Sequence, residues 1–478
     1  MPNKVLLTDL YQLTMMQGYY LHQKNPRGVF DLFYRKREGI NYGVFAGLAS
    51  VIEYVKNLRF DRQDIAYLKS TGLFEKKFLD YLQSFRFSGS IKSVREGEIV
   101  FADEPLLVVD APMIEAQLIE TALLNMIGYQ TLVASKASRI KGQAGKVSTV
   151  IEFGVRRAHG YESAVLGARA AMIGGCDGTS NVLCGKQFGA PVYGTHAHSW
   201  VMSFETELEA FETYANLYPE GCMLLVDTYD TLKSGVPNAI KVFDQLKKKK
   251  KTPLGIRLDS GDLAYLSKQA RKMLDNAGHQ DVKIFVSGDV DEYVIETLRA
   301  QNSKIDSWGV GGKLITGGQN PLLGCVYKLV SIEDTLGARQ IPKMKYSDND
   351  AKTTNPGQKT VHRIYDKDGM AVADLVALSG ESVGEGEKIT LTHPVDRWKH
   401  TTLCEYSTRE LLHDIFVKGT LVYKEPVLKD IAAYAQGELS KFWDEYKRVV
   451  APHIYKVNLS DQLYDLKQSM LQSKNEKY

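Results

Sequence analysis

The sequence is poor in cysteine. Its 478 residues include five cysteines, which are scattered and never lie in a C-x-x-C pair: Cys176, Cys184, Cys222, Cys325 and Cys404. A disulfide framework needs an even set of cysteines and a zinc module needs paired spacing, so neither is indicated. We therefore expect a protein of a reducing compartment.

The sequence also lacks long apolar runs and an excess of either charge. No run approaches the ~18 apolar residues of a membrane-spanning helix. The N-terminus, M-P-N-K-V-L-L-T-D, has no long apolar core after its lysine. We expect a cytoplasmic protein without a membrane partner. The 60 basic and 57 acidic residues leave a net charge of +3, which gives no indication of a nucleic-acid partner.

The length of the chain predicts more than one folding unit. At 478 residues it exceeds the ~250–300 residues of a single core, so we expect two domains or one large barrel with additions. Thr8 is a good N-cap for a helix from Asp9 to Tyr20, whose apolar surface predicts burial or a subunit interface. The following pattern is that of an α+β domain, with a strand at Val29–Arg35, a helical segment at Phe60–Phe87, two short strands within Gly89–Ala111 and a long helix at Glu115–Leu132.

From about Val147 the pattern changes to repeated units of a strand followed by a helix. The apolar strand-like runs are Thr149–Phe153, a short run near Ile173, Pro191–Tyr193, Met223–Val226, Leu254–Leu258, Lys283–Val286 and Ser307–Val310. Such units predict parallel strands, and six or seven in series predict an irregular (β/α) barrel. The site of such a barrel lies at the carboxyl ends of its strands.

The stretch from Gly189 to Phe204 places two histidines, His196 and His198, just past the third of these strands. A neutral imidazole is a competent nucleophile near neutral pH, so a histidine at a strand end is a candidate catalytic group. Two other interpretations remain open. Both side chains are loop histidines with backbone partners, or they form an H-x-H metal pair on one face of an extended segment.

Polar residues follow each predicted strand, in the segments Phe153–Arg157, Gly174–Asn181, Gly194–Ser199, Asp227–Asp230, Arg257–Asp262, Ser287–Asp289 and Trp308–Thr316. Glycine-rich strand ends offer backbone N–H groups to phosphate, and arginine binds two oxygens of a phosphate or carboxylate at once. Aspartates hold Mg²⁺ or ribose hydroxyls, and one near a sugar C1 stabilises an oxocarbenium-like transition state. The set predicts a phosphorylated sugar as ligand, with Mg²⁺-pyrophosphate beside paired aspartates.

Nine short motifs occur in order: T-D-L-Y-Q-L-T-M (Thr8–Met15), F-G-V-R-R-A-H-G, G-G-C-D-G-T-S-N, G-T-H-A-H-S, L-V-D-T-Y-D, I-R-L-D-S-G-D, V-S-G-D, G-V-G-G-K-L-I-T and L-G-C-V-Y-K-L-V (Leu323–Val330). Together they resemble the nicotinate phosphoribosyltransferases, a family of type II phosphoribosyltransferases. The resemblance implies an α+β sandwich-like domain, built from N-terminal and C-terminal segments, and an irregular α/β barrel.

The resemblance also implies a reaction. Nicotinate is joined to the phosphoribosyl group of 5-phosphoribosyl 1-pyrophosphate, giving nicotinate mononucleotide and pyrophosphate in the salvage branch of NAD biosynthesis. ATP hydrolysis is coupled to this transfer through a phosphohistidine, which makes the enzyme ligase-type. Mg²⁺ accompanies pyrophosphate and ATP, and the active site lies at the subunit interface of a homodimer.

Individual residues take roles by the same resemblance. The phosphorylated histidine falls on His198, and Arg257 and Asp259 complete the catalytic set. The substrate-binding positions are Tyr11 (from a second subunit) and Phe153 on the two faces of the pyridine ring, Arg156 and Thr195 near nicotinate, Ser287, Gly288 and Asp289 beside ribose and pyrophosphate, and Gly311, Gly312 and Thr316 around the 5-phosphate. Asp177, Asp227 and Asp230 are further binding candidates, with helix caps as the other interpretation. No metal ligand is assigned.

We place the N-terminal α+β domain at residues 1–130, the barrel at 131–340 and a C-terminal segment that completes the first domain at 341–478. Lys343–Lys359 is a basic stretch, interpreted either as a clamp on ATP or pyrophosphate or as an exposed loop. Ile389–Tyr478 is predicted to be mainly helical and carries no site.

Two other functions remain open. A nicotinamide-specific phosphoribosyltransferase is distinguished by comparing turnover of the acid and the amide, and the T-D-L-Y and G-T-H-A-H-S forms favour the acid. A barrel that binds sugar phosphates as a sensor would release no pyrophosphate.

Overall fold

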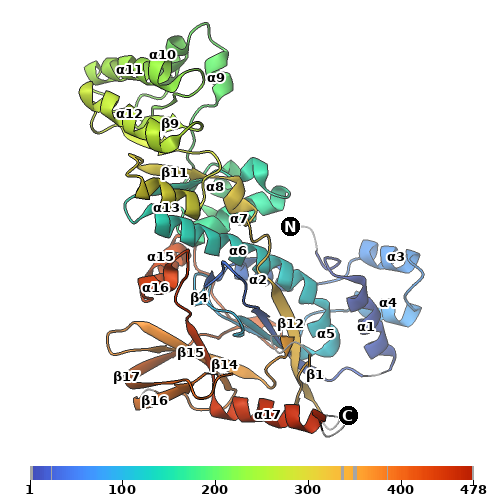
Figure 1. Cartoon of the computed structure of the whole chain (residues 1–478). Helices are drawn as coiled ribbons and strands as arrows, with labels where there is room; N and C mark the ends of the chain where they lie inside the picture. The colour runs from blue at the N-terminus through green and yellow to red at the C-terminus, as the bar shows by residue number, and fades with distance from the viewer. Residues whose placement is uncertain are drawn as a thin grey trace. The chain divides into compact units, whose positions relative to one another are not determined.

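The structure is a computed structural model that describes residues 4–22, 24–334, 339–347, 352–384, 386–393 and 395–475. The chain divides into two compact units, the first made of Met1–Leu132 with Leu322–Tyr478 and the second of Val133–Pro321 (Figure 1). In the described ranges, no helix is both long enough and apolar enough to cross a bilayer.

Within the described residues, seven strands form the main sheet of the first unit, and their pairings are antiparallel. In sheet order they are β13 (Gln340–Pro342), β12 (Cys325–Glu333), β1 (Arg27–Tyr34), β5 (Leu107–Pro112), β3 (Ser90–Ser93), β18 (His413–Val417) and β19 (Thr420–Leu421). Since β12 pairs with β1 and β18 with β3, both ends of the chain share one sheet. The predicted domain of N-terminal and C-terminal segments is confirmed.

The helices of this unit that precede α6 include α1 (Leu10–Leu21), α2 (Leu48–Lys56), α3 (Arg62–Ser70), α4 (Lys76–Gln83) and α5 (Met113–Leu118). Three details differ from prediction. Asp9 rather than Thr8 precedes α1, because the Thr8 hydroxyl donates to the carbonyl oxygen of Leu118 at 3.1 Å. The segment Phe60–Phe87 forms two helices, with Gly72 at a φ of 72° between them. The long helix is α6 (Glu120–Ala144), which continues well past Leu132.

A second sheet in the first unit comes from the C-terminal segment. Its strands, in order, are β16 (Gly386–Thr392), β17 (His400–Glu410), β14 (Lys359–Tyr365), β15 (Ala371–Leu378) and β20 (Lys456–Leu459). Helices α15 (Leu428–Leu439), α16 (Asp444–Lys447) and α17 (Asp461–Asn475) lie among them in the sequence. Ile389–Tyr478, predicted to be mainly helical, contains these three helices and also strands of both sheets. Strand β17 pairs with both β16 and β14, and its Leu403 and Tyr406 pack, partly buried, against an apolar cluster that includes Ile364 of β14.

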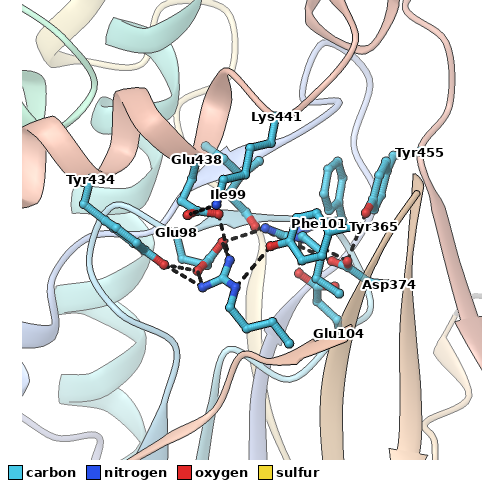
Figure 2. A network of polar contacts seen from close by, with 12 residues as sticks. Glu98, Ile99, Phe101, Glu104, Tyr365, Asp374, Tyr434, Glu438, Lys441 and Tyr455 are labelled. Atoms are coloured by element: carbon cyan, nitrogen blue, oxygen red, sulfur yellow. Dashed lines mark hydrogen bonds and ion pairs between the residues drawn. The ribbon is translucent and has the colours of Figure 1, made fainter. Parts of the chain in front are cut away.

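Buried charged side chains join the C-terminal segment to β4 (Ile99–Val100) of the first unit (Figure 2). Arg363 on β14 is fully buried and forms ion pairs with Glu98 at 2.6 Å and Asp374 at 2.7 Å. Arg409 on β17 contacts the second oxygen of Glu98 at 2.9 Å. Burial acts to raise the pKa of Glu98, but the two guanidinium groups outweigh it, so that pKa lies below its usual value.

Over the part of the chain that the structure describes, the sheet of the second unit has six parallel strands. In order they are β7 (Gly178–Thr179), β6 (Thr149–Glu152), β11 (Ser307–Val310), β10 (Lys283–Val286), β9 (Gly255–Leu258) and β8 (Met223–Leu225). Helices follow the strands along the chain, with three in a row between β7 and β8. They are α7 (Tyr161–Ile173), α8 (Val182–Phe188), α9 (His198–Met202), α10 (Glu207–Leu217), α11 (Val236–Lys248), α12 (Leu263–Asn276), α13 (Glu292–Ala300) and α14 (Gly312–Ile315). The predicted α/β class with a parallel sheet is confirmed.

Two predicted strands of this sheet differ from the structure. The run near Ile173 is the end of α7, and the strand lies further on, at β7. The Pro191–Tyr193 run forms a single parallel bridge, between Val192 and Thr179 of β7. A few residues later, the amide of Leu225 on β8 donates to the imidazole of His196 at 3.2 Å. One short segment therefore contacts both edge strands of this sheet, β7 and β8.

Candidate active site

The carboxyl ends of β8, β9 and β10 bring the candidate residues to one edge of the second unit. The three strands are adjacent and parallel. Asp259 and Ser287 directly follow β9 and β10, and Asp227 lies two residues past β8. Since the carboxyl ends of neighbouring parallel strands meet at the same edge, these side chains reach one another.

His198 is the first residue of α9, and Asp227 holds its imidazole. The Nε2 atom lies 3.1 Å from Oδ1 of Asp227, whose carboxylate is almost fully buried. The other oxygen of Asp227 accepts from the amide of Asp259 at 3.0 Å and from the hydroxyl of Ser260 at 2.6 Å. Because a carboxylate only accepts hydrogen bonds, Nε2 donates and Nδ1 carries the imidazole lone pair. The side chain is 40% exposed, so a substrate can reach it.

Arg257 connects the ends of β9 and β10 with the loop at Thr195 through its guanidinium group. It donates to Ser287 Oγ at 2.8 Å, to Thr195 Oγ1 at 2.9 Å and to Asp259 Oδ1 at 2.8 Å. Burial acts to raise the pKa of Asp259, but the hydrogen bond from Ser287 and the charge of Arg257 outweigh it, and the pKa is lowered. Asp259 is therefore an ionised carboxylate in a fixed orientation.

Phe153 lies at the end of β6 and packs on the neighbouring strands. Its ring centroid is 5.5 Å from that of Phe285 on β10, and the guanidinium carbon of Arg257 lies 5.5 Å from the ring. A Cβ at Gly309 on β11 would lie 2.8 Å from the Phe153 ring, so a glycine there makes room for the aromatic side chain. Arg156 follows on the exposed 3₁₀ turn Val155–Arg157.

The remaining strand ends carry backbone features suited to phosphate and ribose. Gly288 and Asp289 are exposed and adopt positive φ values of 96° and 45°, and a Cβ at Gly288 would lie 2.4 Å from the carbonyl oxygen of Asp259. Gly311 precedes the short helix α14, which Gly312 begins. The Thr316 hydroxyl donates to the carbonyl oxygen of Gly312 at 2.8 Å, which closes this turn.

His196 is held differently from His198. It is 8% exposed, and its Nε2 accepts from the amide of Leu225 at 3.2 Å. Burial lowers the pKa of His196 to about 4. The imidazole is therefore neutral and accepts a hydrogen bond from the backbone, as expected for a loop histidine with a backbone partner. Because α9 begins at His198, the two rings do not share one extended face, which removes the argument for an H-x-H metal pair.

We expect His196 to make stability depend on pH in a defined window. The folded pKa of about 4 lies below the ordinary 6.5, so the unfolded chain binds the proton more tightly. The contribution of the neutral imidazole to the free energy of unfolding is complete above pH 6.5, and it is lost as the pH falls from 6.5 towards 4. At pH 5 the loss is about 2 kcal/mol. The difference in free energy of urea unfolding between wild type and His196→Asn, measured at pH 7 and pH 5, should shrink by this amount. An unchanged difference would contradict it.

Two of the predicted binding aspartates make hydrogen bonds that stabilise the local structure. Asp177 accepts from the amide of Val150 at 2.7 Å and pairs with Lys141 at 2.7 Å. Val150 lies near the start of β6, so Asp177 is at the opposite end of the strands from the site. Asp230 accepts from two amides at the start of the π-helical turn Thr231–Gly235, which makes it the cap of that turn.

The first unit contains the other candidates. Tyr11 lies on α1 and is 49% exposed. The Lys343–Lys359 stretch includes residues 348–351, which lie outside the described residues. At its end, Lys359 is buried and forms an ion pair with Asp31 on β1 at 2.9 Å. Lys359 therefore belongs to neither a clamp nor an exposed loop.

Sequence reasoning missed Glu152, the last residue of β6. Its buried carboxylate accepts from the Thr179 hydroxyl at 2.6 Å and from the amide of Gly154. Burial raises the pKa of Glu152 above its usual value, although the two hydrogen bonds act to lower it. The contacts fix the backbone on either side of Phe153. A charged residue in an otherwise apolar strand, T-V-I-E-F, was the signal that could have identified it.

The fold and the strand-end cluster define an α/β protein with its site at the carboxyl ends of parallel strands. Three family models match the chain: the nicotinate phosphoribosyltransferase (NAPRTase) N-terminal domain at residues 6–128, the NAPRTase family at 148–369 and the C-terminal domain at 358–467. The nicotinate phosphoribosyltransferase of Bacillus subtilis is 46% identical over 467 residues, which cover 97% of this chain and 94% of the relative.

More distant relatives agree. The nicotinate phosphoribosyltransferase of Dictyostelium discoideum is 36% identical over 517 residues, covering 96% of this chain and 87% of the relative. The crystal structure of human nicotinic acid phosphoribosyltransferase matches with a TM-score of 0.83 at 29% identity, over 97% of this chain and 99% of that chain. The chain belongs to the nicotinate phosphoribosyltransferase family.

Proposed function

We propose that this chain transfers the phosphoribosyl group of 5-phosphoribosyl 1-pyrophosphate to nicotinate, coupled to ATP hydrolysis through a phosphohistidine at His198. Family membership supports the transfer reaction. One observation carries the coupling: the hydrogen-bonded chain from His198 through Asp227 to Asp259 and Arg257. It connects an exposed imidazole directly to the residues that would bind ribose and pyrophosphate.

In the transfer step, the pyridine nitrogen of nicotinate forms a bond to C1 of the ribose. The C1–O bond to pyrophosphate breaks, and its electron pair leaves with pyrophosphate. Arg257 and the ionised Asp259, held together at 2.8 Å, supply charges of both signs to a transition state that separates charge in this way. The ring of Phe153 offers one face to the pyridine, and Arg156 is an exposed cation for the nicotinate carboxylate.

In the coupling step, Nδ1 of His198 attacks the γ-phosphorus of ATP. A P–N bond forms, the P–O bond to ADP breaks, and water later hydrolyses the phosphohistidine. Asp227 holds the Nε2 proton, which keeps the lone pair on Nδ1 and stabilises the positive charge that the ring gains. Coupling requires that the phosphorylated form bind substrates or the transition state differently from the free form.

Ser287, Gly288 and Asp289 would bind ribose and pyrophosphate, Thr195 would lie by nicotinate, and Gly311, Gly312 and Thr316 would surround the 5-phosphate. The donor set fits Mg²⁺ that arrives with phosphate ligands, because Asp259 is ionised and Asp289 is exposed, and Mg²⁺ prefers one or two carboxylates plus phosphate oxygens. When bound, Mg²⁺ neutralises charge on pyrophosphate and ATP.

We also propose a homodimer in which Tyr11 of one subunit supplies the second aromatic face of the other subunit's nicotinate site. The exposed Leu10 and Tyr11 on α1 support a surface that a partner covers. All five cysteines are free, which supports action in a reducing compartment such as the cytoplasm. Family membership supports a role in NAD salvage.

A steady-state assay with each pyridine, with and without ATP, tests the proposal. We expect release of pyrophosphate with nicotinate, a kcat/KM for nicotinamide at least about 100-fold lower because the amide leaves the cationic site unpaired, and a higher rate with ATP. Preference for nicotinamide would identify the amide-specific enzyme. Tight binding of phosphoribosyl pyrophosphate without pyrophosphate release would identify a sensor.

A further inference from the structure

Three charged side chains are buried together in the second unit, away from the substrate-contacting residues proposed above. Glu292, the first residue of α13, is 2% exposed. Its carboxylate lies 2.7 Å from Nζ of Lys136 and 3.4 Å from Nε of Arg139, and both cations are buried on α6. Burying charges is costly unless they are paired, so one carboxylate with two cations constrains every element that carries them.

The first of these elements is the turn that ends at Glu292. Gly288 and Asp289 both have positive φ, a conformation that is strained for an aspartate. On one side the turn is fixed by the close approach of Gly288 to the carbonyl oxygen of Asp259. On the other side Asp291 caps α13 by accepting a hydrogen bond from the amide of Val294, and Glu292 forms ion pairs with two cations of α6. A strained turn persists only when it is held at both ends.

Lys136 also reaches the turn that follows α14. A Cβ at Gly318 would lie 3.2 Å from Nζ of Lys136, so the ammonium group packs on this turn. Within the same region Lys313, on α14, lies 3.3 Å from the carboxylate of Asp291. The turn after β10 and the turn after β11 are therefore tied to each other directly and to α6 through Lys136.

We propose that Glu292, held by Lys136 and Arg139, is a positioning residue for binding of the ribose 5-phosphate and pyrophosphate groups. It fixes the backbone of Asp289 and of the Gly311–Thr316 turn without contacting substrate. The inference rests on the proposed function, because those two turns are the ones assigned to phosphoribosyl pyrophosphate. Loss of the ion pair would loosen both turns and weaken that substrate selectively.

Glu292→Gln and Lys136→Met test this, since each removes one charge; the glutamine keeps the side-chain length and the methionine is one atom shorter than lysine. We expect KM for phosphoribosyl pyrophosphate to rise about tenfold or more, with KM for nicotinate within about twofold of wild type and kcat largely retained. Isothermal titration calorimetry with phosphoribosyl pyrophosphate should show the same loss of affinity, and Lys136→Arg, which keeps the charge, should restore most of it.

Lys141→Met is the matched control, because Lys141 lies on the same helix and its ion pair with Asp177 is also 2.7 Å long, but at the opposite end of the strands. It should leave both KM values unchanged. A merely structural role for Glu292 would lower the melting temperature or the active fraction without moving KM for phosphoribosyl pyrophosphate, and that result overturns the proposal. If Glu292→Gln does not fold, Lys136→Met alone decides. Absence of binding and turnover in wild type would instead refute the proposed function.

Discussion

His198→Ala is expected to abolish the increase in turnover that ATP gives, while transfer of the phosphoribosyl group to nicotinate without ATP survives. The alanine removes Nδ1, the atom that would accept the phosphoryl group, but leaves Arg257 with its bonds to Ser287, Thr195 and Asp259. The rate with ATP should fall to the rate without it. Initial rates at fixed nicotinate and phosphoribosyl pyrophosphate, with and without ATP, measure this directly.

Transfer of label from γ-labelled ATP to the protein gives an independent readout. Wild type should become labelled and His198→Ala should not. His400→Ala is the matched control, because His400 is an exposed histidine on β17 of the first unit and its removal should change neither rate nor label. Any stimulation by ATP that remains in His198→Ala would refute the assignment of the phosphohistidine.

The edge of the sheet on which the site lies could be predicted from sequence because parallel strands share a direction. Once the segments ending at Val226, Leu258 and Val286 are identified as successive parallel strands, Asp227, Asp259 and Ser287 must lie at the same edge. The structure brings these residues together with His198 through hydrogen bonds of 2.6–3.1 Å. No tertiary information was needed for that step.

The position of Asp177 could not be predicted because its strand was misplaced. The last four residues of α7, Ala170–Ile173, are apolar and buried, and so short an apolar run does not distinguish a helix from a strand. Placing a strand at Ile173 made Asp177 appear to follow it. The strand begins one residue after Asp177, so the carboxylate lies before the strand and bonds the start of β6.

The different roles of His196 and His198 could not be predicted from the sequence either. Only Ala197 separates the two residues, but α9 begins at His198. The ring of His196 therefore contacts an amide on β8, whereas the ring of His198 contacts the carboxylate of Asp227 after β8. The C-terminal sheet was missed for another reason. Strand β17 has the sequence H-T-T-L-C-E-Y-S-T-R-E, whose few apolar residues do not alternate regularly with polar ones.

Replacing Arg363 with methionine is expected to destabilise the first unit by about 3–5 kcal/mol. The guanidinium is fully buried and neutralises Asp374, and it shares Glu98 with Arg409. Without it Asp374 is a buried charge with no cation. Glu104, whose pKa is raised by burial and by the neighbouring Asp374, supplies no positive charge in place of the guanidinium. Urea unfolding at neutral pH, followed by circular dichroism, measures the loss.

A second substitution separates the lost pairing from the lost packing. In Arg363→Met with Asp374→Leu, the uncompensated carboxylate is gone, while Glu98 still has Arg409 at 2.9 Å, so we expect the double variant to regain about half of the lost stability. Lys92→Met is the control, because its pair with Asp414 is 3.7 Å long and solvent-exposed and should contribute about 0–1 kcal/mol. Equal losses in the single and double variants would mean that the cavity left by Arg363, rather than the buried charge of Asp374, causes the destabilisation.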